Sequence, residues 1–203
     1  MAVNIIITGV GGQGSVLASR IVAGALLQHA GSDPQYRVRV GETFGAAQRG
    51  GSVASHVRAG SVLGPLVGED QADLIVALEP LEGLRIAVRY LKPGGTVVLN
   101  TRAVPPTDVK AGYAQYPALE AILEALDRLG GKVIALDATA LAEEAGSIKA
   151  MNVVLVGAAA RTGLTGVHRE TFLQAVEDRV PARFKALNLK AFDLGWQCAG
   201  EAT

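Results

Sequence analysis

The first thirty residues of the chain place a β-branched run, a glycine cluster and an apolar helical stretch directly after one another. Residues 2–8 read AVNIIIT, a short run typical of a buried strand. The run leads into GVGGQG, which matches the G-x-G-x-x-G pattern with Gly9, Gly11 and Gly14. Residues 15–30 then carry apolar side chains around most of a helix. A strand, a tight glycine turn and a helix in this order favour helices wound onto a parallel sheet.

The rest of the chain continues this alternation of strands and helices. Further strand patterns occupy residues 36–40, 52–60, 72–80, 92–100 and 130–138. Helical spacing covers residues 80–91 and 119–129 and most of the chain from about 139–198, while the proline-containing segment 101–117 is expected to be irregular. We predict a three-layer α/β/α Rossmann-like domain with a mostly parallel sheet and a C-terminal helical segment. Residues 1–203 should form a single domain on which the helices of about 139–198 pack.

Composition argues against several classes of protein. The 19 basic and 19 acidic side chains give zero formal net charge, so no basic field is available to hold nucleic acid. The one cysteine, Cys198, has no partner for an internal disulfide and is too few for an iron–sulfur cluster. The start lacks signal-peptide features, and no apolar run approaches the roughly 20 residues that span a bilayer. We therefore expect a cytoplasmic protein without a membrane or nucleic-acid partner.

The first glycine cluster is suited to bind an anionic group. Glycine permits a tight turn and lets main-chain N–H groups approach a phosphate, which the positive end of the following helix also favours. The alternative is that these glycines only allow close packing of the strand on the helix. A stand-alone NAD-binding oxidoreductase would use Gly9, Gly11, Gly14 and Glu42. However, Glu42 lies 28 positions after Gly14, whereas an acidic ribose ligand usually follows at about 20.

A second glycine cluster, GETFGAAQRGGSVASHVRAG, occupies residues 41–60. It is expected to form a loop at the carboxyl end of the second strand, where open α/β sheets present ligands and partners. Arg49 offers a planar charged donor to a phosphate or a facing carboxylate, although an ordinary surface ion pair is an equal alternative. The residues that we predict at a partner interface are Thr43, Phe44, Gly45, Gln48, Arg49, Gly50, Gly51 and Ser52.

The two clusters together resemble the gamma component of the 2-oxoacid:ferredoxin oxidoreductases, and most of all the beta subunit of the indolepyruvate:ferredoxin type. The motifs that carry the resemblance are G-x-G-G-Q-G at residues 9–14 and Q-R-G-G-S-V at residues 48–53. It continues through ADLIVALEP, GGTVVLN, MNVVLVGAAA and LNLKAFDLGW, and so covers nearly the whole chain. Two glycine motifs in the same order and spacing are far more specific than one G-x-G-x-x-G.

The resemblance implies a subunit of a larger enzyme that is inactive alone. That enzyme decarboxylates a 2-oxoacid oxidatively with coenzyme A, giving an acyl-CoA, carbon dioxide and reduced ferredoxin. Thiamine diphosphate and iron–sulfur clusters would lie only on partner subunits, and the chain would hold no catalytic residue or metal of its own. Coenzyme A would lie at the interface of the complex, and ferredoxin would be an indirect partner. The residues that we expect to border the cofactor are Gly9, Gly11, Gly12, Gln13 and Gly14.

Polar residues in apolar surroundings complete the set of candidates. We expect His56 to be a core histidine bonded to main chain, and Asn152 and Asn188 each to bond a loop or cap a turn. Glu79 and Asn100 follow strands and are expected at the rim of the ligand crevice.

The last helix raises a third possibility for the function. Apolar positions of residues 182–198 follow three and four spacing and predict a narrow stripe that packs along another helix. The stripe consists of Phe184, Leu187, Ala191, Leu194 and Cys198. In the third interpretation, the chain is a scaffold that forms a homodimer through this stripe. Cys198 would then be a small apolar side chain.

Overall fold

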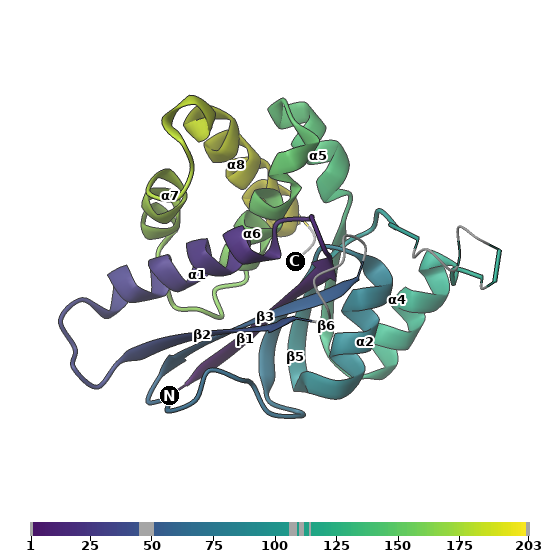
Figure 1. Cartoon of the computed structure of the whole chain (residues 1–203), viewed down its shortest axis with the longest axis horizontal. Helices are drawn as coiled ribbons and strands as arrows, with labels where there is room; N and C mark the ends of the chain where they lie inside the picture. Colours follow the sequence, from purple (N-terminus) through teal and green to yellow (C-terminus); the bar gives the residue numbers. More distant parts are fainter. Residues whose placement is uncertain (1, 45–50, 106–108, 110–111, 114, 202–203) are drawn as a thin grey trace.

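The computed structural model of the chain describes residues 2–44, 51–105, 109, 112–113 and 115–201. Six strands form one sheet in the order β2-β3-β1-β4-β5-β6 (Figure 1). Their bounds are Val3–Val10 (β1), Arg37–Phe44 (β2), Ser52–Gly60 (β3), Ala72–Ala77 (β4), Leu91–Asn100 (β5) and Lys132–Leu136 (β6). The strand β3 runs antiparallel to both of its neighbours, and all other pairs are parallel. The predicted mostly parallel α/β sheet is therefore confirmed.

Helices cover both faces of the sheet. Their bounds are Ser15–Ala30 (α1), Pro80–Tyr90 (α2), Leu119–Arg128 (α4), Ala138–Ala145 (α5), Met151–Arg161 (α6), Arg169–Glu177 (α7) and Lys185–Glu201 (α8). Two short 3-10 helices, Ile148–Ala150 (η1) and Ala182–Phe184 (η2), precede α6 and α8. In Figure 1, α2 and α4 lie on one face, and α1 lies on the other with α5 to α8. Among the described residues, no helix is long and apolar enough to cross a membrane.

The central strand β1 supplies the cores on both faces. Ile5 and Ile7 belong to the larger apolar cluster beneath α1 and α6, whereas Ile6 belongs to the smaller cluster beneath α2 and α4. All three are fully buried. Alternate side chains of a strand point to opposite faces, so a strand covered on both faces needs an unbroken apolar run. This is the physical basis of the AVNIIIT sequence.

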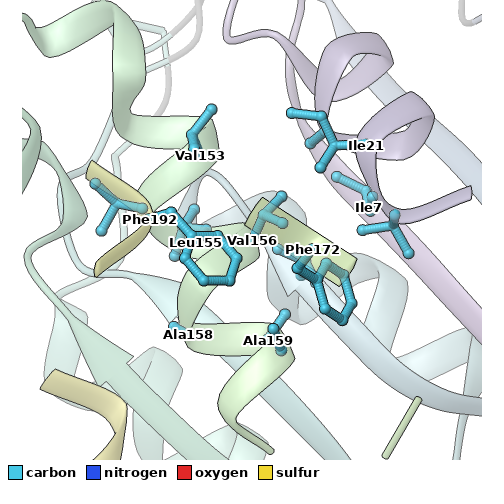
Figure 2. Packing of buried hydrophobic residues seen from close by; sticks show 14 of the residues in the cluster. Ile7, Ile21, Val153, Leu155, Val156, Ala158, Ala159, Phe172 and Phe192 are labelled. Atoms are coloured by element: carbon cyan, nitrogen blue, oxygen red, sulfur yellow. The ribbon is translucent and has the colours of Figure 1, made fainter. Parts of the chain in front are cut away.

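The helical layer is held together by a close crossing of α6 and α8. A Cβ atom on Gly157 of α6 would lie 2.1 Å from the Phe192 carbonyl oxygen, and one on Gly195 of α8 would lie 1.9 Å from the Val154 carbonyl oxygen. Figure 2 shows Phe192 beside Leu155 and Val156 of α6 in the buried cluster. The two backbones thus meet where neither helix carries a side chain, and the apolar surface around the contact is excluded from water.

The predicted apolar stripe was placed on the wrong side of the last helix. The residues of α8 that are buried are Asn188, Ala191, Phe192, Gly195 and Ala199. Only Ala191 is shared with the prediction, and Phe184 is 43% exposed. The prediction followed the large side chains, but Gly195 sets which side of α8 faces α6. The buried side of α8 therefore packs within the chain, which removes the basis of the third interpretation, a homodimer formed through this helix.

The second strand is longer than the sequence indicated. We predicted a strand over residues 36–40, whereas β2 extends to Phe44 because Gly41 to Phe44 continue the ladder with β3. Thr43 and Phe44 therefore belong to this hairpin, not to a loop. Residues 45–50, between these two strands in the sequence, are outside the described residues.

The close crossing predicts that Gly195→Ala destabilises the protein. The added methyl would be forced against the Val154 carbonyl, and strain of this kind costs about 1–3 kcal/mol or more. Gly200→Ala in the same helix is the matched control, because its methyl would meet only the flexible end of Arg161. Urea unfolding should show a large loss for the first variant and a change within about 1 kcal/mol for the second. Equal stabilities would contradict the packing described here.

Candidate functional site

The turn between β1 and α1 depends on two glycines in the left-handed region. Gly12 has a φ of 102° and Gly14 a φ of 85°. Side chains rarely adopt these angles, so glycine is required at both positions. Gly14 is the N-cap residue of α1 and, unlike Ser, Thr or Asp, offers no side-chain acceptor to the first helical turn. The helix therefore begins with its N-terminal N–H groups uncapped by a side chain.

The side chain of Gln13 stabilises the turn through two hydrogen bonds. The Val10 N–H donates to Gln13 Oε1 at 2.7 Å, and Gln13 Nε2 donates to the Leu78 carbonyl at the end of β4 at 3.2 Å. A Cβ on Gly9 would lie 2.5 Å from Gln13 Oε1. Gly9 thus makes room for the amide of Gln13, which links the loops that follow β1 and β4. Both polar groups of this side chain are engaged within the chain.

Asn152 supports the same turn from the helical layer. Its Nδ2 donates to the Gly14 carbonyl at 3.0 Å, and the residue is only 2% exposed. A Cβ on Gly14 would lie 2.5 Å from this nitrogen. Asn188 caps a turn in a similar way, with Nδ2 donating to the Phe184 carbonyl at 2.9 Å. The prediction that these amides bond loops or turns is confirmed for both.

The two glycine clusters meet in space. The Gly11 N–H donates to the Gly51 carbonyl at 2.8 Å, which joins the turn after β1 to the start of β3. Val10 of β1 pairs with Ser52 of β3 directly beside this bond. Thr43 and Ser52 are exposed near the tip of the hairpin. The predictions for Gly45, Gln48, Arg49 and Gly50 fall outside the described residues, and so does the side chain of Phe44.

A pocket of about 300 Å³ lies where these segments come together. Its lining residues are Gly11, Gly12, Gly14, Ser15, Val16, Glu42, Thr43, Val53, Ala54 and Ser55. Four of them, Gly11, Gly12, Gly14 and Thr43, are among the predicted site residues, while Gly9 and Gln13 shape the turn from behind. The prediction missed the first helical turn, and although it included Ser52 at the start of β3, it missed Val53 to Ser55. The alternation of Val53 and Ser55 on one side of β3 is the signal that could have found the latter.

The pocket combines a positive helix end with one carboxylate. The main-chain N–H groups of Ser15 and Val16 donate to no described residue, and the first turn of α1 contains no acidic residue. Such an end favours an acceptor or an anion. Glu42 is the only charged side chain among the described lining residues. It lies in β2, directly opposite Ser55 of β3. The walls therefore offer donors on one side and an acceptor on the other.

Glu79 and Asn100 do not lie at the rim of this crevice. Both are 1% exposed, so the expectation was wrong. Glu79 caps α2 by accepting from the Glu82 N–H, and its other oxygen accepts from the Tyr116 hydroxyl. Burial and the Glu79 carboxylate raise the pKa of Tyr116 well above its usual range. Asn100 Nδ2 donates to the Leu78 carbonyl at 3.2 Å. Polar residues that follow strands here satisfy buried main chain instead of facing a ligand.

His56 is a core histidine, as predicted. It is 2% exposed, and its Nδ1 accepts from the Val67 N–H at 3.1 Å, which places the imidazole proton on Nε2. Burial, followed by the nearby Arg58 guanidinium, lowers the pKa of His56. Cys198 is half-buried beside the larger core, and burial raises the pKa of its thiol. Neither residue lines the pocket.

Comparison with known proteins places the chain in a family. The family model described as pyruvate ferredoxin/flavodoxin oxidoreductase matches residues 4–198. The chain belongs to this family. It is similar to the indolepyruvate oxidoreductase subunit IorB of Pyrococcus horikoshii, with 44% identity over 98% of this chain and 96% of that protein. It is also 30% identical, over 90% of this chain and 89% of that protein, to the pyruvate/ketoisovalerate oxidoreductases common subunit gamma of Thermococcus kodakarensis.

Solved structures agree with this assignment. The gamma subunit of a keto/oxoacid ferredoxin oxidoreductase from Geobacter sulfurreducens superposes with a TM-score of 0.71 at 25% identity, covering 98% of this chain and 99% of that one. A 2-oxoglutarate:ferredoxin oxidoreductase from Magnetococcus marinus has the same fold in 32% of its chain, with a TM-score of 0.72 at 22% identity over 100% of this chain. The chain is thus a subunit of a 2-oxoacid:ferredoxin oxidoreductase, and subunits of this type act with catalytic partner subunits.

The contact between Asn152 and Gly14 predicts a measurable stability effect. Asn152→Leu keeps the volume but removes one of the two hydrogen bonds to the half-buried Gly14 carbonyl, which still accepts from the Ala18 N–H, so the loss should be about 0.5–1.5 kcal/mol. Gln174→Leu is the control, because that amide is exposed and bonds only Asp178. Urea unfolding of the two variants measures the difference. An Asn152→Leu protein as stable as the control would show that the bond contributes nothing.

The buried imidazole predicts a dependence of stability on pH. Because the folded state lowers the pKa of His56, the unfolded chain binds a proton more readily. The contribution of His56 to the free energy of unfolding should therefore be complete at pH values above the unfolded pKa of roughly 6.5. At lower pH the free energy of unfolding should decrease, by at most about 1.4 kcal/mol per pH unit. His56→Gln keeps an acceptor for Val67 without titrating. Urea unfolding between pH 7.5 and 5 should show a shallower fall for this variant, and parallel curves would contradict the argument.

Proposed function

We propose that this chain is the small, non-catalytic subunit of an oxidoreductase of the indolepyruvate or aryl pyruvate type. In this proposal it forms part of the coenzyme A site and part of the interface with a subunit that carries thiamine diphosphate and iron–sulfur clusters. The observation that carries the proposal is the pocket at which both glycine clusters meet, joined by the bond from Gly11 to Gly51. Family motifs that are distant in the sequence thus contribute to one surface.

The substrate class rests on the relatives. Four indolepyruvate oxidoreductase subunits match with 36% to 44% identity over at least 98% of this chain. The pyruvate/ketoisovalerate gamma subunits match at 29% and 30%. The higher identity and coverage support an aryl 2-oxoacid over a short-chain one. The 2-oxoacid itself would bind mainly on the partner subunit, so this chain would affect its turnover through assembly.

The pocket fits part of a coenzyme A molecule. The uncapped N–H groups of Ser15 and Val16 can donate to phosphate or amide oxygens, and Glu42 can accept from a hydroxyl or an amide N–H. The structure from Magnetococcus marinus, which shares the fold, was solved with 2-oxoglutarate, coenzyme A and succinyl-CoA bound. Coenzyme A supplies the thiol that receives the acyl group. In the proposal, the residues of this chain bind and orient its non-reacting part.

The redox cofactors are proposed to belong to the partner. An iron–sulfur cluster usually takes four thiolates, whereas this chain has one cysteine, Cys198. Among the described residues, no three His, Cys, Asp or Glu side chains come together to hold a metal ion. The predicted partner interface is again Thr43, Phe44, Gly45, Gln48, Arg49, Gly50, Gly51 and Ser52. Thr43 and Ser52 are exposed beside the pocket, which supports docking of a partner at this edge.

The proposal predicts that activity requires the complex and that the pocket controls coenzyme A. The isolated chain should not turn over a 2-oxoacid, whereas co-expression with the thiamine-bearing subunit should give 2-oxoacid-dependent dye reduction.

Val16→Asp adds a carboxylate to the uncapped helix end, which should raise the KM for coenzyme A about tenfold with the kcat unchanged. Val16→Thr is the matched control without charge. Arg49→Ala should weaken assembly instead.

Two outcomes would contradict the proposal. Turnover of a 2-oxoacid by the isolated chain would exclude a non-catalytic role. An unchanged KM for coenzyme A in Val16→Asp, in a complex that assembles normally, would remove coenzyme A from this pocket.

A further inference from the structure

A second pocket lies on the other side of the first turn of α1. It has a volume of about 200 Å³ and is formed where α1, η1, η2 and α8 meet. Its lining residues are Leu17, Ser147, Lys149, Ala150, Val180, Pro181, Phe184, Leu187 and Asn188. Most of this surface is apolar, and none of the described residues that line it is acidic.

The rim of this pocket exposes apolar and basic side chains together. Ile148 is 54% exposed and Phe184 is 43% exposed. Lys149 is exposed, and its ammonium pairs with no carboxylate in the described part of the chain. The Arg183 guanidinium lies 4.7 Å from the centre of the Phe184 ring and likewise forms no ion pair with a described residue. An apolar hollow with Lys149 in its wall and Arg183 beside Phe184 is chemically complementary to an apolar side chain flanked by acidic residues.

The pocket lies near the candidate cofactor site, at the same end of α1. Ser15 and Val16 line the cofactor pocket, and Leu17, the next residue, lines this one. On the opposite wall, Lys149 and Ala150 line this pocket, and Asn152 shortly after them bonds the Gly14 carbonyl. A typical protein interface covers about 800 Å² on each partner. A partner that closes over the cofactor pocket would therefore extend over this one.

We infer that this pocket receives a bulky apolar side chain from an acidic segment of the catalytic partner subunit. The volume suits one aliphatic or aromatic side chain and falls below the roughly 300–1,000 Å³ of small-molecule sites. A second copy of this chain fits poorly, because a symmetric contact would bring Lys149 and Arg183 close to the same cations of the other copy. The inference rests on the proposed partner subunit, but it does not depend on coenzyme A binding in the other pocket.

The test measures how much of this chain is needed to activate the partner. Purified chain is titrated into a fixed amount of the catalytic partner subunit, and 2-oxoacid-dependent dye reduction gives the half-maximal concentration and the rate at saturation. Phe184→Asp should raise the half-maximal concentration about tenfold or more, with the saturating rate unchanged. Lys149→Glu should also raise it and reduce its dependence on salt, whereas Lys149→Arg should behave as wild type.

Matched controls separate docking from general effects of the substitutions. Val88→Asp places a carboxylate at a 61% exposed position of α2, on the other face of the sheet. Lys132→Glu reverses an exposed charge at the start of β6. Both controls should leave the titration unchanged, and thermal unfolding should show that all variants are folded. If Phe184→Asp does not fold, Lys149→Glu carries the test alone, because its side chain is on the surface.

Distinct outcomes would overturn the inference or the proposed function. Titrations of Phe184→Asp and Lys149→Glu that overlay the wild type would overturn the docking site. Self-association of the isolated chain in sedimentation velocity, abolished by Phe184→Asp, would assign the pocket to a second copy and also overturn it. By contrast, an unchanged KM for coenzyme A in Val16→Asp, with a shifted titration for Phe184→Asp, would remove only the coenzyme A site.

Discussion

The whole site depends on the fit between Gly9 and the side chain of Gln13. Because Gly9 has no Cβ, the Gln13 amide can fold back over β1, accept from Val10 and donate to the Leu78 carbonyl. This links the loops after β1 and β4, which are adjacent parallel strands. With the turn held from behind, the main chain of Gly11 and Gly12 and the start of α1 remain available at the surface.

The antiparallel strand β3 distinguishes this pocket from one between two adjacent parallel strands. It is inserted between β1 and β2, so Glu42 reaches the pocket from a strand that is not a neighbour of β1. The same insertion brings the tip of the β2–β3 hairpin to the glycine turn, where Gly51 accepts from Gly11. The N-terminus of α1, which has no side-chain cap, thus lies near the start of β3. Such a surface is better suited to close contact with another backbone than to enclosing a cofactor alone.

The helical layer both supports this surface and extends it. The crossing at Gly157 and Gly195 brings α8 onto α6, and α6 in turn places Asn152 beneath Gly14. The same packing leaves Phe184 and its neighbours at the edge of α1 as an apolar pocket with a basic rim. One set of helices therefore both stabilises the turn and forms the second pocket.

The sequence by itself determined the α/β class, the strand–glycine–helix unit and the family, because these follow from local apolar periodicity and from glycine motifs of defined spacing. It also identified His56 and Asn152 as structural residues. Only the tertiary structure decided that Gly11 bonds Gly51, that Glu79 and Asn100 are buried, and which side of α8 faces α6. These features depend on contacts between segments far apart in the chain and on backbone distances at glycines, neither of which leaves a periodic signal in the sequence.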